Sequence, residues 1–149
     1  ELSHGENFKL FLKEIKKMQN QLSTNNKYVP IFIKISPDEL SNDLAIICSS
    51  ILDSKLDGII CSNTTVDHDH KNGPGGLSGA PLRNKATECL VAVRKLVGNK
   101  LPIIASGGVM SAQDYQEKLD AGANLVQIYT GFIYEGPQLI KDILNLRKV

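Results

Sequence analysis

The sequence lacks several features that would point to particular classes of protein. It has no excess of one charge, since 17 Lys and Arg face 16 Asp and Glu and leave a formal net charge of +1. Electrostatic binding of nucleic acid needs a basic surface, so this balance argues against it. No apolar run approaches the roughly 20 residues that span a bilayer, and the polar start, residues 1–6, does not resemble a signal peptide. We therefore expect this segment to be soluble.

Cysteine is scarce as well. Cys48, Cys61 and Cys89 are far apart, odd in number, and form no CxxC pair. This argues against a disulfide framework or a zinc site and favours a reducing compartment. Cys48 and Cys61 stand among apolar residues, which predicts small buried side chains. The run Asp67-His68-Asp69-His70 suggests a metal cluster, but alternating spacing in an extended loop places its side chains on opposite sides. We expect a solvated loop there and no metal.

What the sequence does contain is an alternation of helix-like and strand-like segments. A leading helix is predicted from apolar residues at three- and four-residue steps, which place them on one face: Phe8, Phe11, Ile15, Met18 and Leu22. Short apolar runs predict strands over 31–35, 58–61, 101–105 and 125–128. A helix is expected after each strand: the first ends near residue 54, and the others span 84–97, 112–121 and 138–146. Asp38 and Ser41 are candidate N-caps of the first of these.

Consecutive strand–helix units imply parallel strands in an α/β fold, either as an open doubly wound sheet or as a closed barrel. Polar or glycine-rich residues follow every predicted strand: Lys34, Asn63-Thr64, Gly107-Gly108 and Tyr129-Thr130. A barrel collects the carboxyl ends of all its strands around one mouth, whereas an open sheet concentrates its ligand at one switch point. The pattern favours the barrel.

The units present make half of a (β/α)₈ TIM barrel, which typically takes about 250 residues. A half barrel exposes two sheet edges, which is an aggregation liability. We therefore expect residues 1–149 to be the C-terminal part of a single barrel domain whose N-terminal half, preceding Glu1, is absent. The leading helix, which has no strand of its own, agrees with this interpretation.

Two loops have the character of a phosphate site. Ser106-Gly107-Gly108 follows a predicted strand and precedes a helix with Ser111 near its start, and Tyr129-Thr130-Gly131 follows the next strand. Glycine lets backbone N–H groups approach an anion closely, and barrels often bind phosphate with the loops after their last two strands. A paired glycine can also simply form a tight turn. The longest predicted loop, 65–82, is rich in glycine and has no predicted structure of its own, which is typical of a functional or a disordered loop.

Lys34 and Asn63-Thr64 are candidate ligand contacts. Lys34 lies near the end of an apolar strand, where burial is unfavourable unless an anion meets the charge; a lysine reaching into solvent is the competing interpretation. Asn63 offers a donor and an acceptor on one flat group, which suits a planar heterocycle with amide edges. An ordinary turn after a strand explains Asn63 and Thr64 equally well.

Taken together, the motifs resemble the C-terminal part of class 2 dihydroorotate dehydrogenases. The segments that carry the resemblance appear in order over nearly the whole chain: Ile33-Lys34-Ile35-Ser36-Pro37-Asp38, Ser62-Asn63-Thr64-Thr65, Gly75-Gly76-Leu77-Ser78-Gly79, Ser106-Gly107-Gly108-Val109 and Leu125-Val126-Gln127-Ile128-Tyr129-Thr130-Gly131. The Asn-Thr-Thr and Gly-Gly-Leu-Ser-Gly runs are similar to class 2 rather than class 1, and the end of the chain is most similar to bacterial members.

The resemblance implies oxidation of (S)-dihydroorotate to orotate in pyrimidine synthesis, with FMN taking the hydride and a quinone reoxidising it. It also implies residue roles. Lys34 would contact the flavin ring and stabilise its reduced, anionic form, and Asn63 and Thr64 would bind the pyrimidine ring. The other FMN contacts implied are Ser62 and Gly79 along the site and Gly108, Tyr129 and Thr130 at the phosphate.

One departure from the class 2 pattern limits what these residues could do alone. The serine that acts as base lies on a loop ahead of the leading helix in that family, and neither Ser3 nor Ser23 matches its motif. The resemblance therefore places the base, the first half of the flavin site and the membrane-associating helices outside these residues. It implies a peripheral location on the cytoplasmic face of the bacterial inner membrane, and we expect this segment alone to be inactive. Another FMN barrel, or a non-redox phosphate-binding module, are the alternatives.

Overall fold

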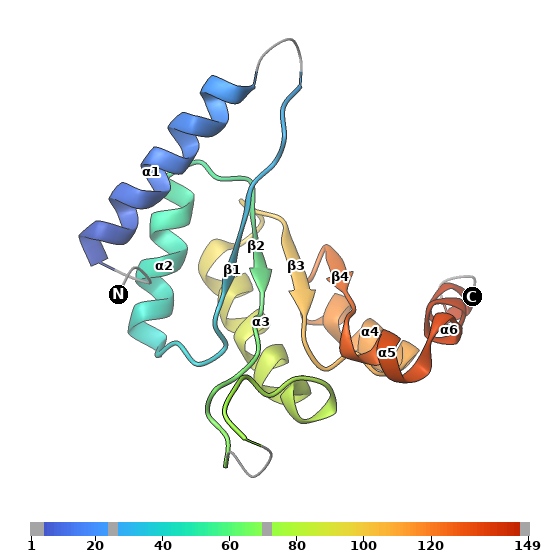
Figure 1. Cartoon of the computed structure of the whole chain (residues 1–149). Helices are drawn as coiled ribbons and strands as arrows, with labels where there is room; N and C mark the ends of the chain where they lie inside the picture. The colour runs from blue at the N-terminus through green and yellow to red at the C-terminus, as the bar shows by residue number, and fades with distance from the viewer. Residues whose placement is uncertain (1–4, 24–26, 70–72, 147–149) are drawn as a thin grey trace.

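Strands and helices alternate along the chain as the sequence predicts. The computed structural model describes residues 5–23, 27–69 and 73–146. Its first part comprises α1 (Gly5–Leu22), β1 (Phe32–Ile35), α2 (Ser41–Asp53) and β2 (Gly58–Cys61). The second part comprises the 3₁₀ turn η1 (Ala80–Leu82), α3 (Arg83–Val97), β3 (Ile103–Ser106), α4 (Ala112–Asp120), β4 (Leu125–Gln127), α5 (Thr130–Glu135) and α6 (Pro137–Leu146) (Figure 1).

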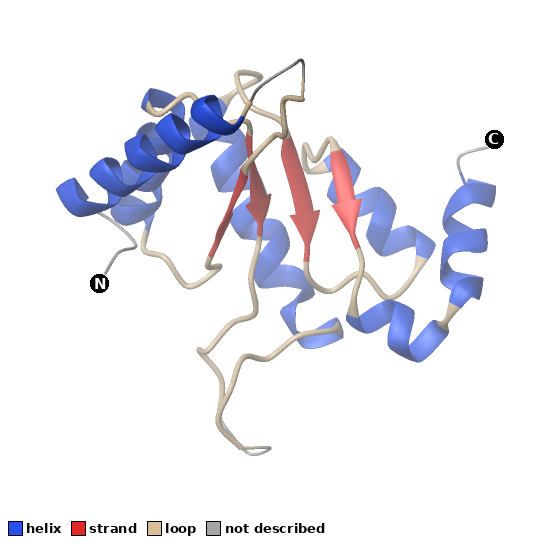
Figure 2. Cartoon of the chain, turned by 45° about the horizontal axis from the view of Figure 1, so that its top comes forward, coloured by secondary structure: helices blue, strands red, loops and turns tan. Residues whose placement is uncertain are grey.

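The strands form one parallel sheet in the order β1-β2-β3-β4. Every strand therefore pairs with its neighbour in sequence, and helices connect consecutive strands along the chain (Figure 2). A doubly wound sheet reverses its strand order at a switch point, whereas a barrel adds strands consecutively in one direction. The observed order confirms the α/β prediction and has the topology of four consecutive barrel units.

The two faces of the sheet differ in character. The face toward the helices carries the core, and Ile59, Ile103 and Ala105 are fully buried there. The opposite face is more open, because Lys34 and Leu125 are exposed. The register aligns Lys34, through the two central strands, with Leu125. Side chains on this face would point into the interior of a closed barrel.

The predicted apolar face of α1 is partly wrong. Phe8 is buried as expected, but Phe11, Met18 and Leu22 are 46%, 52% and 73% exposed. The stripe that packs on the core runs instead through Phe8, Leu12, Ile15 and Gln19. Gln19 is buried because its amide donates to the Val29 carbonyl and to Asp57.

The predicted caps of α2 are also wrong. Its N-cap is Leu40, which makes no side-chain bond to the helix, and Ser41 is the first helical residue. Asp38 lies before the helix and bonds elsewhere. Two short elements were not predicted, η1 inside the long loop and α5 directly after β4. The loop also contains an antiparallel bridge between Thr65 and Leu77, so it has structure of its own.

The cysteines are buried thiols, as predicted for Cys48 and Cys61. Cys89 is buried beside them, with its Sγ 3.3 Å from that of Cys61. Burial raises the pKa of Cys48 to about 11. That thiol is therefore protonated at neutral pH and behaves as a small apolar side chain.

Asp57 joins α1 to the start of the sheet. One carboxylate oxygen accepts from the Tyr28 hydroxyl, and the other accepts from the Gln19 amide at 2.6 Å and the Ile31 N–H at 2.7 Å. Partial burial alone would raise the pKa of Asp57, but these bonds together outweigh it and hold the pKa below its ordinary value. The ionised form is therefore the one that this junction stabilises.

We expect Asp57→Asn to lower the free energy of unfolding by about 1–3 kcal/mol at pH 7. An amide offers one acceptor oxygen, so its NH₂ group must face a donor that the carboxylate satisfied. The contribution of the carboxylate is complete above its ordinary pKa of about 3.9 and is lost as the pH falls below it. Urea titrations at pH 7 and below pH 4 should therefore show that the difference in the free energy of unfolding between the wild type and Asp57→Asn becomes smaller in acid. A difference independent of pH would contradict this role.

Candidate functional site

A cavity of about 110 Å³ lies at the carboxyl ends of the four strands. Strand β1 contributes Lys34, the segments that follow β2, β3 and β4 all contribute, and so does the glycine-rich loop. Every residue that the sequence pointed to as a cofactor or substrate contact lines it: Lys34, Ser62, Asn63, Thr64, Gly79, Gly108, Tyr129 and Thr130. Sites that enclose a small organic ligand are typically about 300–1,000 Å³. The cavity is therefore large enough for only part of such a ligand.

One side of the cavity is formed by β1 and the segment after β2. Lys34 is exposed there, and it is the only charged residue among the described residues that line the cavity. The Ser62 N–H donates to the Ser106 carbonyl at 2.9 Å, and the Asn63 N–H donates to the Ile35 carbonyl at 2.8 Å. Backbone bonds to both neighbouring strands thus fix the start of this segment. The Asn63 side chain remains exposed to a ligand.

The opposite side is the loop after β3, which sits directly on the first turn of α3. Gly107 and Gly108 have φ values of +110° and +78°, a region that L side chains rarely adopt. A Cβ on Gly108 would lie 2.3 Å from Arg83 Cα, and one on Gly107 would lie 2.9 Å from Leu82 Cδ2. Glycine is therefore required at both positions for conformation and for space, and both glycines line the cavity.

The segment after β4 meets the glycine-rich loop. The Thr130 hydroxyl donates to the Ser78 hydroxyl at 3.0 Å, and a Cβ on Gly79 would lie 3.0 Å from Thr130 Cγ2. Gly131 is buried against the loop after β3, where a Cβ would lie 2.1 Å from the Val109 carbonyl oxygen. These close approaches bring three backbone segments to one point. Glycine-rich backbone of this kind can approach a phosphate closely.

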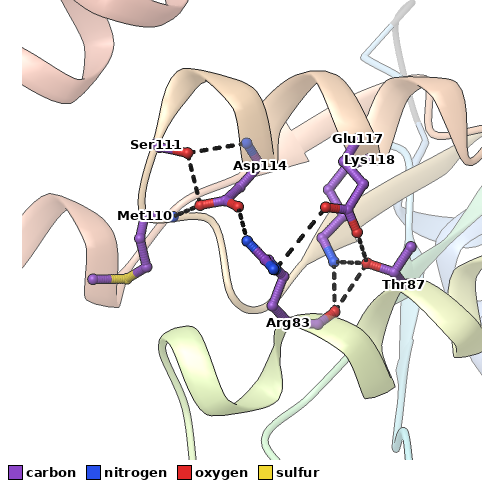
Figure 3. Close-up of polar contacts among 7 residues, drawn as sticks. All are labelled: Arg83, Thr87, Met110, Ser111, Asp114, Glu117 and Lys118. Carbon is purple, nitrogen blue, oxygen red and sulfur yellow. Dashed lines mark hydrogen bonds and ion pairs between the residues drawn. The ribbon is translucent and has the colours of Figure 1, made fainter.

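A network of charged side chains holds the loop after β3 in place (Figure 3). The Asp114 carboxylate accepts from the Met110 N–H at 3.0 Å, the Ser111 hydroxyl at 2.9 Å and Arg83 Nη1 at 2.7 Å. Ser111 in turn accepts from the Asp114 N–H and so caps α4, a role that was not predicted from the sequence. Partial burial would raise the pKa of Asp114, but Arg83 and the other donors outweigh it and hold the pKa low.

Lys118, on α4, completes the network. Its side chain is fully buried, and its ammonium group donates to the Arg83 carbonyl at 3.0 Å and to Thr87 (Figure 3). Burial lowers the pKa of Lys118. Because Lys118 and Asp114 both reach the first turn of α3, they join α4 to the residue on which Gly108 rests.

This constellation can be compared with known proteins. A family model described as dihydroorotate dehydrogenase matches residues 4–147, which is nearly the whole chain. The chain belongs to this family. The site described above is thus part of a dihydroorotate dehydrogenase fold, and membership of the family implies a flavin cofactor.

Curated relatives specify the branch of the family. The chain is 43% identical over 151 residues to a dihydroorotate dehydrogenase (quinone) of Vibrio parahaemolyticus, and 47% identical over 153 residues to one of Dichelobacter nodosus. These alignments cover 97% and 98% of this chain but 45% of each relative. The resemblance to the quinone-dependent class is confirmed, and the chain spans about half the length of the curated relatives it matches.

Solved structures support the fold. A crystal structure of the Eimeria tenella dihydroorotate dehydrogenase in complex with ferulenol matches with a TM-score of 0.89 at 27% identity, covering 97% of this chain and 44% of that one. The ligand-free form of that protein matches with a TM-score of 0.88 at 28% identity. The strands described here therefore correspond to part of a dihydroorotate dehydrogenase barrel.

Two polar residues of the dihydroorotate dehydrogenase cavity were not singled out from the sequence. Ser78 bonds Thr130, and Gln127 ends β4 opposite Ser106 in the register. Gln127 carried a usable signal, because it is a polar residue at the end of an apolar strand. Ser78 carried none outside its motif, since only the fold brings it next to Thr130.

The described part of the chain offers no metal cluster. Residues 5–23, 27–69 and 73–146 contain no group of three or more His, Cys, Asp and Glu residues placed to hold a metal ion. Asp67 instead accepts from Lys85 at 2.9 Å, and His68 Nε2 lies 2.8 Å from the Gly75 carbonyl oxygen. His70 lies outside the described residues. None of the described helices is both long and apolar enough to cross a membrane.

Proposed function

We propose that residues 1–149 form the C-terminal part of a single FMN-binding (β/α)₈ barrel that oxidises (S)-dihydroorotate to orotate with a quinone as electron acceptor. FMN would accept the hydride from the substrate and pass the electrons on to the quinone. The reaction would serve de novo synthesis of pyrimidines. The protein would act at the cytoplasmic face of a bacterial inner membrane. The region that attaches it there would correspond to a part of the relatives that residues 1–149 do not match.

One observation carries the proposal. The residues singled out from the sequence come from β1, from the segments that follow β2, β3 and β4, and from the glycine-rich loop, and all of them line one cavity. The cavity lies at the carboxyl ends of parallel strands, which is where barrels of this kind hold their active sites. A single charged side chain on one wall and a glycine-lined backbone on the other suit a ligand with a polar ring and a phosphate.

The residues that would hold the cofactor divide into three roles. Gly108, Tyr129 and Thr130 would hold the FMN phosphate, because the loops that carry them are in close contact beside the cavity. Ser62 and Gly79 would line the cofactor site between the phosphate and the ring. Lys34 would contact the flavin ring, where its charge opposes the negative charge that hydride transfer brings.

The pyrimidine ring would be bound by Asn63 and Thr64. The Asn63 amide can both donate to and accept from a ring amide, and the Thr64 hydroxyl can do the same. The base that removes a substrate proton would lie in the part of the full-length protein that corresponds to the unmatched half of the relatives. These 149 residues alone are therefore expected to lack dehydrogenase activity.

The test is the visible absorption spectrum of the full-length protein, followed by addition of dihydroorotate without any acceptor. A bound flavin that bleaches on addition would establish both the cofactor and the substrate. Dihydrouracil, which lacks the carboxylate of dihydroorotate, is the matched control and should leave the spectrum oxidised.

Other outcomes assign the protein differently. A flavin spectrum that bleaches with dihydrouracil alone would indicate a different dihydropyrimidine dehydrogenase. A flavin that stays oxidised with both dihydroorotate and dihydrouracil would support an FMN-binding barrel but contradict dihydroorotate as its substrate. A colourless protein that does not take up added FMN would indicate a non-redox phosphate-binding module.

A further inference from the structure

Asp38 stands where three segments of the chain meet. It follows β1, and its carboxylate accepts from the Thr65 hydroxyl at 2.5 Å, the Val66 N–H at 2.8 Å and Lys85 Nζ at 2.5 Å. Thr65 and Val66 belong to the segment after β2, and Lys85 belongs to the first turn of α3. One side chain thus ties β1 and α3 to the segment after β2.

Thr65 is held on its backbone side as well. Only 3% of its surface is exposed, and its N–H and carbonyl both pair with Leu77, at 3.2 and 2.7 Å. Lys85 adds a bond to the Thr65 hydroxyl at 3.1 Å. The position of Thr65 is therefore fixed by bonds from both its side chain and its backbone.

Thr65 is the residue after Asn63 and Thr64. Asn63 is anchored to Ile35 by its N–H, so the pair is held between that bond and the bonds at Thr65. The room for Thr64 is narrow, because a Cβ on Gly76 would lie 2.0 Å from its Oγ1. A small shift of Thr65 would therefore move Thr64 against the glycine-rich loop.

Asp38 does not itself line the cavity, whereas Asn63 and Thr64 do. We propose that Asp38, charge-paired with Lys85, is a positioning residue that sets the Asn63–Thr64 pair for the pyrimidine substrate; this inference rests on the proposed function. Partial burial would raise the pKa of Asp38, and the bonds from Lys85, Thr65 and Val66 together hold it below its ordinary value. The acceptor is therefore charged at neutral pH, and its bonds to Thr65 and Val66 are the stronger for it.

The experiment is Asp38→Asn in the full-length protein, with orotate binding followed by the change in flavin absorbance. The amide has the size of the carboxylate but lacks its charge and one acceptor. We expect orotate to bind about tenfold more weakly, with a matching rise in the KM for dihydroorotate and little change in FMN content. An orotate affinity equal to that of the wild type would overturn the proposal.

Asp57→Asn is the matched control. Asp57 is also a carboxylate with three bonded partners, but it lies at the amino end of the sheet, away from the cavity. Its amide variant should lose stability and keep the wild-type orotate affinity. Equal weakening in both variants would mean that lost stability alone explains the effect, and would overturn the proposal.

Two further measurements keep the test decisive. If Asp38→Asn does not fold, Lys85→Met takes its place. It removes the paired charge and the bond from Lys85 to Thr65, and leaves Thr65 and Val66 bonded to Asp38. Unchanged orotate affinity in that variant counts against the proposal. If the wild type itself neither bleaches with dihydroorotate nor binds orotate, the proposed function fails. Amide hydrogen exchange at Thr65 and Leu77 then tests whether Asp38 holds Thr65 in place. Faster exchange in Asp38→Asn than in Asp57→Asn supports this role, and equal exchange in the two variants overturns it.

Discussion

Lys34→Ala in the full-length protein should slow reduction of the flavin by dihydroorotate by about 10²- to 10³-fold, the usual effect of removing one group that stabilises charge developing in a reaction. Lys34 is the only charged residue among the described residues that line the cavity. Stopped-flow absorbance without a quinone isolates the reductive step from reoxidation, and so measures the step in which the charge acts.

Folding should hardly change in this variant. Lys34 is exposed, and no hydrogen bond or ion pair within the described ranges involves its ammonium group. Lys34→Arg keeps the charge with a different shape, and should fall between the wild type and the alanine variant. Lys100→Ala, at an exposed lysine before β3, is the matched control for the loss of one surface charge. Reduction at the wild-type rate in Lys34→Ala would remove Lys34 from the chemistry.

The alternation of strands and helices was readable from the sequence because buried parallel strands are apolar on both faces. The run from Gly58 to Cys61 is found as predicted. The predicted third strand began too early, at Leu101, whereas β3 begins at Ile103. Pro102 explains the difference, because it has no N–H for the ladder, although its carbonyl still accepts from Ile59.

The buried face of α1 could not be read from the sequence with the same certainty. Apolar residues occur on more than one side of this helix, so its periodicity is compatible with different buried stripes. The choice depends on Gln19, a polar residue that is buried because Asp57, 38 positions away, accepts from it. A bond across that separation is visible only in the folded chain.

In the candidate site, too, some features could be predicted from the sequence and others depend on contacts between distant segments. Position alone predicted that Lys34, Asn63, Gly108 and Thr130 would gather, since the carboxyl ends of consecutive parallel strands lie side by side. The residues that support them were misjudged or missed. Asp38 was expected to cap a helix and instead bonds Thr65, 27 positions later. Supporting contacts of this kind connect distant segments, so no local pattern indicates them.

The glycine at position 108 provides the sharpest test of the phosphate side of the site. We expect Gly108→Val to weaken FMN binding about ten- to hundredfold, the range that overpacking a tight contact produces. A Cβ there would lie 2.3 Å from Arg83 Cα and 2.6 Å from Arg83 N. The backbone of Arg83 cannot retreat easily, because its carbonyl accepts from Lys118 and its side chain bonds Asp114. The loop must therefore move, and its N–H groups with it.

Gly98→Val separates this effect from backbone strain. Gly98 also has a positive φ, +54°, but a Cβ there meets nothing within 4 Å, and it lies at the end of α3 away from the cavity. Both variants should lose stability, and only Gly108→Val should lose FMN. Riboflavin, which lacks the phosphate, adds a second comparison by equilibrium dialysis. If Gly108 faces the phosphate, its variant should lose most of the preference for FMN over riboflavin. Equal weakening for both ligands would place the phosphate elsewhere, because displaced phosphate contacts cannot affect a ligand that never made them.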